Sequence, residues 1–486
     1  MSKPVFRRLV LASLLTAPLI GCAVGPDFNK PRPDVPAAWS ASASAAPVTP
    51  APADQAATWW IGFNDAELTS LIVRARAANL DARQAVLHIA EARAQRDIAA
   101  SAQWPSLSAN ASAEDNRLSE STPTGALFSK IGQFPGLKGV SIPNPYSQYQ
   151  LGFDASWEID LFGRVRRTVE AAKADTEATA QDSRAVMVST LGEVGRAYVD
   201  LRGAQAKRLV LQDSLATAAD LATLAGQRNA AGLSSDIDLS QAQAQAKLAE
   251  AQIPLLDRQI TQDINQLSLL LALQPGALRA ELDTAAPVPP APPSVPIGLP
   301  GDLARRRPDI GASEARLHAA TARMGVAMAD LYPRVTLGIQ GGFQSEEASS
   351  LTDWASRFFS AGPQVQLPIF DGGQRRAAVR LADIHAQEAA LDYRRTVLGA
   401  LHEVDNALAA YAADQSRNTL LSASVAHNRD ALDLSRQRYA SGLASFIDVL
   451  DAERTLQQNQ LSLADATTAV STDLIGLYKA LGGGWS

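Results

Sequence analysis

The chain has 486 residues, with 50 Asp and Glu against 44 Lys and Arg, and this mildly acidic balance offers no basic surface for nucleic acid. Its single Cys cannot form an internal disulfide, and five His and four Met supply few ligands for a metal. No Ser/His/Asp, Cys/His or phosphate-loop arrangement stands out, so we expect no enzyme, no cofactor and no metal. Abundant Ala with only 6% aromatic residues favours long, closely packed helices.

The first 21 residues predict a signal peptide. Lys3, Arg7 and Arg8 precede an apolar run over 9–20, which is too short for a stable transmembrane helix. The run ends in "LIGC", which resembles a bacterial lipoprotein cleavage site where the Cys22 thiol receives a diacylglycerol. The alternative is a leader cleaved elsewhere, with Cys22 incidental. We expect residues 22–64 to form a lipidated N-terminal linker, and the Ala after Cys22 resembles an outer-membrane address.

The rest of the chain is a duplicated unit. The segment "DLATLAGQRNAAGLSSDIDL" (220–239) is identical to "DALDLSRQRYASGLASFIDV" (430–449) at ten of twenty positions, at an offset of 210 residues. Earlier in each half the offset is 228 residues, so the first half has eighteen more residues, which we expect in the loop 114–146. We predict a first repeat over 65–274, a Pro-rich linker over 275–301, and a second repeat over 302–486.

The first repeat is predicted from its hydrophobic periodicity. In chain order we expect a helix over 65–103, strands over 104–113 and 147–160, a long helix over 164–230 and a return helix over 236–274. No Pro interrupts the long helix, which would be roughly 100 Å in length.

The second repeat is predicted in the same order. We expect a helix over 302–331, strands over 332–344 and 362–370, a long helix over 374–440 and a return helix over 446–481. The helix lengths indicate that both chain ends and the Pro-rich linker lie at one level, midway along a helical column.

The predicted strands alternate apolar and polar residues. In "YQLGFDASWEID" (149–160), the odd positions are apolar and the even positions are mostly polar, so the strand has one face of each kind. Such strands are typical of a transmembrane sheet, although a soluble sheet with one buried face has the same pattern. Four strands cannot close a sheet in a membrane, and lipid does not tolerate open edges. We therefore expect the chain to oligomerise.

A set of motifs gives the chain a family resemblance. In order they are "GCAVGPDF" (21–28), "EIDLFGR" (158–164), "RRRPDI" (305–310), "LPIFDGGQRR" (367–376) and "YKALGGGW" (478–485). Their order and spacing resemble TolC-type outer-membrane efflux proteins, in the lipidated, NodT-like branch of resistance-nodulation-division systems. The resemblance covers nearly all of residues 20–486. It implies a mainly α fold with transmembrane β: a homotrimer forming a 12-stranded outer-membrane β-barrel that continues into a long periplasmic α-helical barrel.

The resemblance also implies a function. The chain would be the outer-membrane exit duct of a tripartite efflux pump, passively conducting drugs or other toxic small molecules from the periplasm to the exterior. Its partners would be outer-membrane lipid, a periplasmic adaptor protein and an inner-membrane resistance-nodulation-division proton antiporter. Two alternatives stay open: the duct of a type I protein secretion system, and a non-conducting structural lipoprotein with a coiled-coil stalk.

Each long helix is predicted to end in a turn at a Gly, Gly232 in "AGLSS" and Gly442 in "SGLAS". After each turn, a Ser and an Asp have the S-x-x-D spacing of a capping box. We assign helix capping as the main role of these two carboxylates, Asp238 and Asp448. Asp451 has no such role, because it lies one turn after Asp448 and its repeat mate is Gln241.

The second turn also resembles the gate of the family. In a trimer, Asp448 and Asp451 would form two stacked carboxylate rings, whose like charges should raise one another's pKa. The resemblance implies that aspartates here line the constriction and favour cations, and that Tyr439 helps to hold the mouth shut. We predict a periplasmic gate of Asp448, Asp451, Tyr439 and Asp238. A family arginine is replaced by Ala444, which leaves Arg438 or Arg228 to substitute for it.

Overall fold

The computed structural model describes residues 23–32, 34–40, 58–140, 142–292 and 300–485. The predicted signal peptide and Cys22 lie outside these residues. The chain divides into two compact units. The first combines residues up to Asn29 with Ala92–Thr176 and Arg316–Ala389, and the second combines Lys30–Glu91, Glu177–Ala315 and Ala390–Ser486. Within the described ranges, every helix is too short or too polar to cross a membrane.

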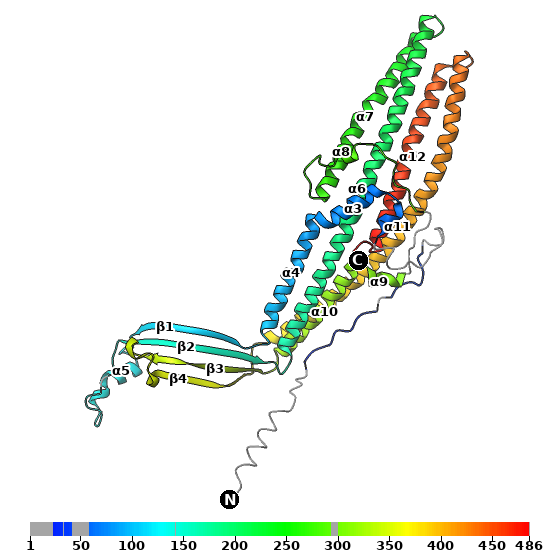
Figure 1. Cartoon of the computed structure of the whole chain (residues 1–486). Coiled ribbons are helices and arrows are strands. Elements are labelled where there is room, and N and C mark those ends of the chain that lie inside the picture. Colours follow the sequence, from blue (N-terminus) through cyan, green and yellow to red (C-terminus); the bar gives the residue numbers. More distant parts are fainter. Residues whose placement is uncertain (1–22, 33, 41–57, 141, 293–299, 486) are drawn as a thin grey trace. The chain divides into compact units, whose positions relative to one another are not determined.

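The first unit contains one antiparallel sheet of four strands in sequence order (Figure 1). The strands are β1 (Ser106–Asn116), β2 (Tyr146–Ile159), β3 (Arg334–Ser345) and β4 (Arg357–Gln366). Each repeat contributes two strands, and β2 pairs with β3 to join the repeats. Large apolar side chains of the sheet are exposed, including Leu107 at 73% and Phe359 at 85%. The sheet of one chain therefore has apolar surface and two open edges, at β1 and β4.

The predicted position of the last strand is wrong by several residues. We expected 362–370, but β4 runs over Arg357–Gln366 because its register with β3 pairs Arg357 with Phe343 and Gln366 with Arg334. Residues after Gln366 lie beyond the start of β3, and Pro368 has no N–H to donate to a ladder. Within one chain β4 is an edge strand, which is where a proline such as Pro363 is found in sheets.

The connections between strands differ in length between the repeats. Residues 117–145 join β1 to β2 and include α5 (Pro123–Lys130) and η4 (Ile131–Gln133). Residues 346–356 join β3 to β4 and include η6 (Ala348–Ser350) and η7 (Trp354–Ser356). The first connection is longer by eighteen residues, which confirms the position predicted for the extra residues of the first repeat.

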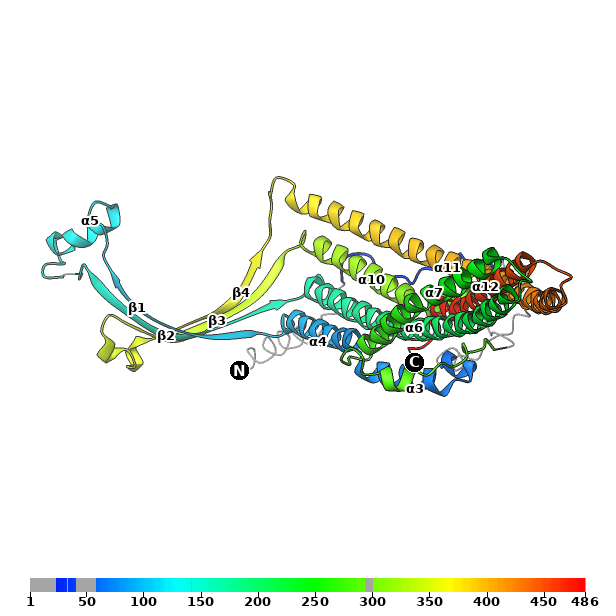
Figure 2. The same ribbon diagram turned by 90° about the horizontal axis from the view of Figure 1, so that it is seen from above.

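Two helical hairpins dominate the second unit. The long helices α6 (Arg164–Ala230) and α11 (Gln374–Ala440) have the predicted bounds, and both begin in the first unit. They turn into α7 (Asp236–Leu270) and α12 (Phe446–Ala480). Figures 1 and 2 show α6 with α7 and α11 with α12 as two hairpins whose turns lie at the same end. The return helix α7 ends four residues before the predicted position, and Ala272 then adopts a left-handed φ of +57°.

The helix expected over 65–103 is broken at Asn79, which separates α3 (Ala66–Ala78) from α4 (Leu80–Ser101). Asn79 has an extended ψ of 134° and is 3% exposed. Its Oδ1 accepts from the Ala82 N–H at 3.0 Å, and its Nδ2 donates to the Leu270 carbonyl at 2.9 Å. The side chain thus caps α4 and satisfies the end of α7, and this tertiary contact explains the break.

The helix expected over 302–331 is also divided. Short segments η5 (Pro300–Asp302) and α9 (Leu303–Arg306) precede α10 (Pro308–Ala329). Pro308 disfavours the helical conformation at Arg307, so the main helix starts at the proline. The Arg307 guanidinium, next to this break, forms ion pairs at 2.7 Å with Asp309 and with Glu403.

The C-terminal residues meet η3 (Trp59–Phe63), just before the first repeat, and the Pro-rich linker in the second unit, which also contains α8 (Arg279–Leu282). Trp59 stacks on Tyr478 with ring centroids 5.7 Å apart. Trp485 Nε1 donates to the Arg306 carbonyl at 3.1 Å, and Ser471 Oγ donates to the Pro289 carbonyl at 2.7 Å. These contacts agree with the expected common level for the start of the first repeat, the C-terminal end and the linker, but the N-terminal residues 23–29 belong to the first unit.

Candidate functional site

The two hairpin turns have the same backbone conformation. Gly232 and Gly442 have φ values of +72° and +74°, a left-handed region that Gly occupies without a Cβ clash. The Leu233 N–H donates to the Arg228 carbonyl at 2.8 Å, and the Leu443 N–H donates to the Arg438 carbonyl at 2.8 Å. Together with the Gly N–H bonds, these form a Schellman motif at the end of each long helix.

Helix capping by the two aspartates is confirmed. The Asp238 carboxylate accepts from the Ser235 N–H at 3.4 Å, and its own N–H donates to Ser235 Oγ at 3.3 Å. Asp448 Oδ2 accepts from the Oγ and the N–H of Ser445, at 2.8 Å and 2.9 Å. The hydrogen bonds from Ser445 lower the pKa of Asp448 because they stabilise its ionised form. The pKa of Asp448 is thus lowered within one chain, whereas the repulsion between stacked carboxylate rings was expected to raise it.

Asp451 lies one turn beyond this cap. Its side chain is exposed, and within the described part of the chain its carboxylate has no hydrogen-bond or ion-pair partner. Its repeat mate Gln241 has no charge. At this position the second hairpin therefore presents a free carboxylate, where the first hairpin has an uncharged amide.

Tyr439 joins the two hairpins. It is 4% exposed and packs against Phe446 at the start of α12, with ring centroids 5.4 Å apart. The Arg228 guanidinium at the end of α6 lies 4.7 Å from the centroid of the Tyr439 ring. Arg228 Nη1 also donates to the carbonyls of Tyr439 and Ala440, at 3.2 Å and 3.3 Å. Arg228 thus stacks on the tyrosine and binds the negative end of α11.

This contact settles which arginine faces Tyr439. The sequence left Arg228 and Arg438 as alternatives, and Arg228 makes the contact, whereas the charge of Arg438 acts on Asp448. No local pattern could have identified Arg228, because the contact depends on the ends of α6 and α11 lying side by side. Burial and the nearby Asp238 carboxylate raise the pKa of Tyr439, so the structure brings Asp238 near this tyrosine as well.

A hydrophobic seam extends from Tyr439 along both hairpins. We use this name for the buried cluster formed by Leu221, Ala225, Ala242, Val425, Leu432, Tyr439, Phe446, Val449, Leu450 and Leu456. Its members come from α6, α7, α11 and α12. Any movement of one hairpin away from the other at this end must expose part of the seam, at a cost of roughly 25 cal/mol per Å² of apolar surface.

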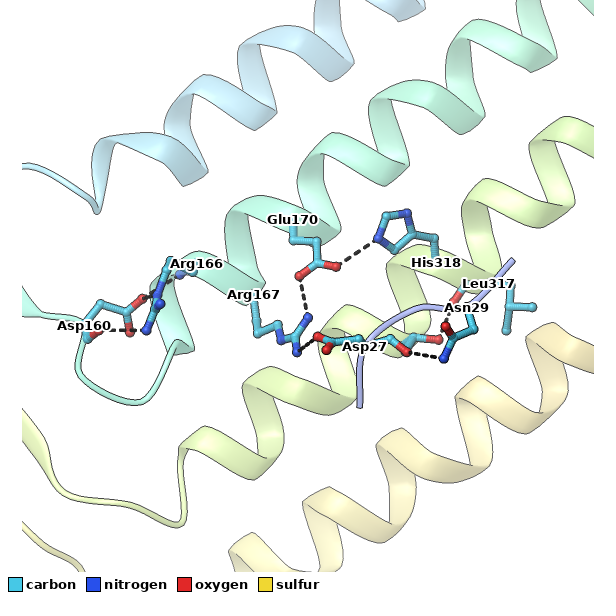
Figure 3. Close-up of polar contacts among 9 residues, drawn as sticks. Asp27, Asn29, Asp160, Arg166, Arg167, Glu170, Leu317 and His318 are labelled. Carbon is cyan, nitrogen blue, oxygen red and sulfur yellow. Dashed lines mark hydrogen bonds and ion pairs between the residues drawn. The ribbon is translucent and has the colours of Figure 1, made fainter. Parts of the chain in front are cut away.

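A second candidate site holds the residues that follow Cys22. Arg167, 5% exposed, forms ion pairs with Asp27 at 2.6 Å and with Glu170 at 2.8 Å. Glu170 in turn contacts His318 Nε2 at 2.9 Å (Figure 3). The Phe28 ring stacks on His318, with ring centroids 4.4 Å apart. The N-terminal segment therefore bridges α6 of the first repeat and α10 of the second, all within the first unit.

Two glycine contacts allow this segment to lie close to α10 and to the residue that precedes α6. A Cβ at Gly25 would be 2.7 Å from the Gly325 Cα, and a Cβ at Gly163 would be 2.8 Å from the Ala23 Cα. Both have positive φ, which adds a conformational reason for glycine. The Val24 N–H also donates to the Phe162 carbonyl at 3.0 Å. The motif "GCAVGPDF" indicated the family resemblance, but it did not predict that its residues dock on α6 and α10.

Neither site has the composition of a metal centre. In the ranges that the structure describes, no cluster of three or more His, Cys, Asp or Glu side chains could hold a metal ion. The chemistry of both sites is that of charge, hydrogen bonding and packing.

Comparison with known proteins identifies the family. The family model for outer membrane efflux proteins matches residues 71–273 and 299–483. The outer membrane protein OprJ of Pseudomonas aeruginosa is 33% identical, over 100% of this chain and 97% of OprJ. The solvent efflux pump outer membrane protein SrpC of Pseudomonas putida is 31% identical, over 99% of each chain.

Solved structures agree with the sequence relatives. The outer-membrane channel OprN is 34% identical, with a TM-score of 0.86 over 96% of this chain and 100% of OprN. CusC, whose structures concern transmembrane channel formation, is 27% identical, with a TM-score of 0.82 over 95% of this chain and 100% of CusC. The chain therefore has the fold of these outer-membrane channels and belongs to the outer membrane efflux protein family.

Proposed function

We propose that this chain, as a homotrimer, is the outer-membrane exit duct of a tripartite efflux pump and passively conducts small toxic molecules out of the periplasm. The names of the relatives support this function, since SrpC and TtgI of Pseudomonas putida are named for solvent and toluene efflux pumps. A periplasmic adaptor and an inner-membrane resistance-nodulation-division proton antiporter complete the proposed assembly.

The observation that supports a trimeric duct best is the open sheet. The edges at β1 and β4 leave backbone groups without a ladder partner, and lipid cannot supply the missing hydrogen bonds. Apolar side chains on the sheet, such as Phe153, Phe359 and Val365, are 59%, 85% and 63% exposed. Pairing of β1 in one copy with β4 in the next satisfies the edges and leaves the apolar side chains to face lipid.

The hairpin turns are the proposed periplasmic gate. Asp451, with the capping carboxylate Asp448 one turn before it, supplies negative charge on the exposed face of α12. Tyr439 and Arg228 hold the second hairpin against the first, and Asp238 lies near this contact. The Schellman turns at Gly232 and Gly442 keep both tips compact. In this proposal, the gate opens when the seam separates, and the exposed aspartates favour cations at the mouth.

The N-terminal segment supports the proposed lipid anchor. Residues 23–29 dock on α6 and α10, and Ala23 lies against Gly163, shortly after the end of β2. Acyl chains on Cys22 then add to the membrane affinity of the sheet. A tagged fatty acid should label the wild type but not Cys22→Ser, and equal labelling of both would contradict the anchor.

Conductance and export together test the proposed duct. The purified protein should form cation-selective channels in a planar bilayer. With a matching adaptor and pump, it should also restore dye efflux to cells that lack their own outer-membrane component. Restored export of a protein without dye efflux would indicate a type I secretion duct. A lack of any channel conductance would contradict both ducts.

A further inference from the structure

One buried carboxyl group in the hairpins has no role in the proposed gate. Glu453 lies on α12 and is 2% exposed. Its neighbours along the same helix face, Val449, Leu450 and Leu456, belong to the hydrophobic seam. Both of its carboxyl oxygens are buried without a hydrogen-bond partner among the described residues. A carboxylate in such a place is costly, because it has lost water and gained no partner.

The charges around Glu453 do not neutralise it by contact. Arg436 on α11 and Arg454 on α12 act on it electrostatically, but neither forms an ion pair with it. Arg454 Nε instead donates to Gln245 Oε1 on α7 at 3.1 Å, and Arg436 Nε is buried without a partner. From α6, the seam receives the apolar side chains Leu221 and Ala225. Burial, opposed by the two arginines, raises the pKa of Glu453 to about 7.

The position of Glu453 connects its protonation to the packing of the hairpins. A neutral carboxyl fits the apolar seam at a small cost, whereas an ionised carboxylate favours any arrangement that admits water. In the first repeat, the corresponding residue is Gln243, which is exposed and cannot ionise. Only the second hairpin therefore contains this group.

We propose that Glu453 makes the closure of the seam depend on protons: its neutral form holds α11 and α12 against α6 and α7, and its ionised form loosens them. This inference rests on the proposed function, in which the gate opens when the seam separates. For a group with a pKa of about 7 in the packed state and 4.5 when hydrated, the opening equilibrium rises about tenfold between pH 6 and pH 8.

Hydrogen exchange on the full-length protein in detergent tests this proposal. Amide protection in α12, corrected for the intrinsic effect of pH, should fall about tenfold from pH 6 to pH 8 in the wild type. Glu453→Gln is uncharged at every pH and should keep its protection constant. If this variant fails to assemble, Glu453→Met tests the same point with an apolar side chain of similar size.

The matched control removes a carboxylate outside the seam. Glu250 on α7 is exposed and pairs with Lys247, so Glu250→Gln should retain the pH dependence of the wild type. Equal pH dependence in the wild type and in the Glu453 variants would overturn the proposal, as would a loss of the dependence in Glu250→Gln. Exchange reports packing and does not require conduction. If the protein shows the Glu453 effect in exchange but forms no conducting channel, the proposed duct is contradicted and the proposal for Glu453 is not.

Discussion

The two hairpin turns are built on the same backbone but differ in what their side chains do. Both have a Gly at positive φ, a Schellman motif and a capping box. In the first turn, Asn229 donates to the Ser234 carbonyl and to Asp236, so its polar group is satisfied locally. In the second, Tyr439 occupies the equivalent position and contacts the other hairpin.

The difference continues along the return helices. Gln241 and Gln243 in the first repeat correspond to Asp451 and Glu453 in the second, one exposed and one buried. Both copies thus retain the residues that shape the turn, while Tyr439, Asp451 and Glu453 occur only in the second copy. This comparison teaches that the second hairpin is the specialised half of the proposed gate.

The largest expected effect comes from removing the aromatic ring that joins the hairpins. Tyr439→Ala deletes a side chain that is 4% exposed, and it should lower the free energy of local opening by about 3 kcal/mol. Asn229→Ala, at the equivalent position, should cost about 1 kcal/mol or less because it removes only local hydrogen bonds. Hydrogen exchange of α11 and α12 measures both, and equal effects would contradict a specialised second hairpin.

Removal of Arg228 should have the next largest effect. Arg228→Ala loses the stacking on Tyr439 and the hydrogen bonds to the end of α11, which we expect to cost about 1–2 kcal/mol of tip stability. Arg438 is the control, since it is at the same position in the other hairpin and makes no contact with Tyr439 that the structure describes. A greater loss in Arg438→Ala, measured by the same exchange, would assign the contact to the wrong arginine.

The shared backbone predicts equal effects in the two turns. Gly232→Ala and Gly442→Ala each place a Cβ at a left-handed position and should each cost about 1 kcal/mol. No other atoms lie within 4 Å of a Cβ built at either glycine, so the cost should be conformational in both. Thermal unfolding of the two variants compares them, and a difference of more than about 1 kcal/mol would show that the turns are not equivalent.

The smallest effect is expected at the first cap. Asp238→Asn keeps a side chain that can accept the hydrogen bond from Ser235 but removes a charge near the N-terminus of α7, at a cost of about 0.5–1 kcal/mol. The variant should unfold slightly earlier than the wild type at neutral pH. If it instead loses channel function with unchanged stability, Asp238 has a role beyond capping.

The sequence predicted those parts of the fold that depend on local patterns. Both long helices have the predicted bounds, because a proline-free run ends at a Gly turn and a capping Ser and Asp begin the next helix. The sheet was predicted from alternation, but the register of β4 depends on β3 and was wrong. The break at Asn79 was missed because it depends on the Leu270 carbonyl, 191 residues away.

In the candidate site, too, local features were predictable from the sequence and contacts between distant helices were not. Gly232, Gly442, Asp238 and Asp448 were recognisable from spacing, and their turns and caps are present in the structure. The contact of Arg228 with Tyr439, the burial of Glu453 and the docking of residues 23–29 involve helices distant in sequence. No single-sequence pattern encodes these contacts, because the packing of the hairpins and of α6 with α10 creates them.

Ion selectivity tests the central claim most directly, namely that the exposed carboxylates of the second hairpin form the charged mouth of the gate. We would measure the reversal potential in a planar bilayer under a salt gradient for the wild type, for Asp448→Asn with Asp451→Asn, and for Asp238→Asn. The double variant should lose much of its cation selectivity, since both exposed carboxylates in the first two turns of α12 are gone, whereas Asp238→Asn should stay close to the wild type. Wild-type selectivity in the double variant, or its loss in Asp238→Asn alone, would contradict this assignment.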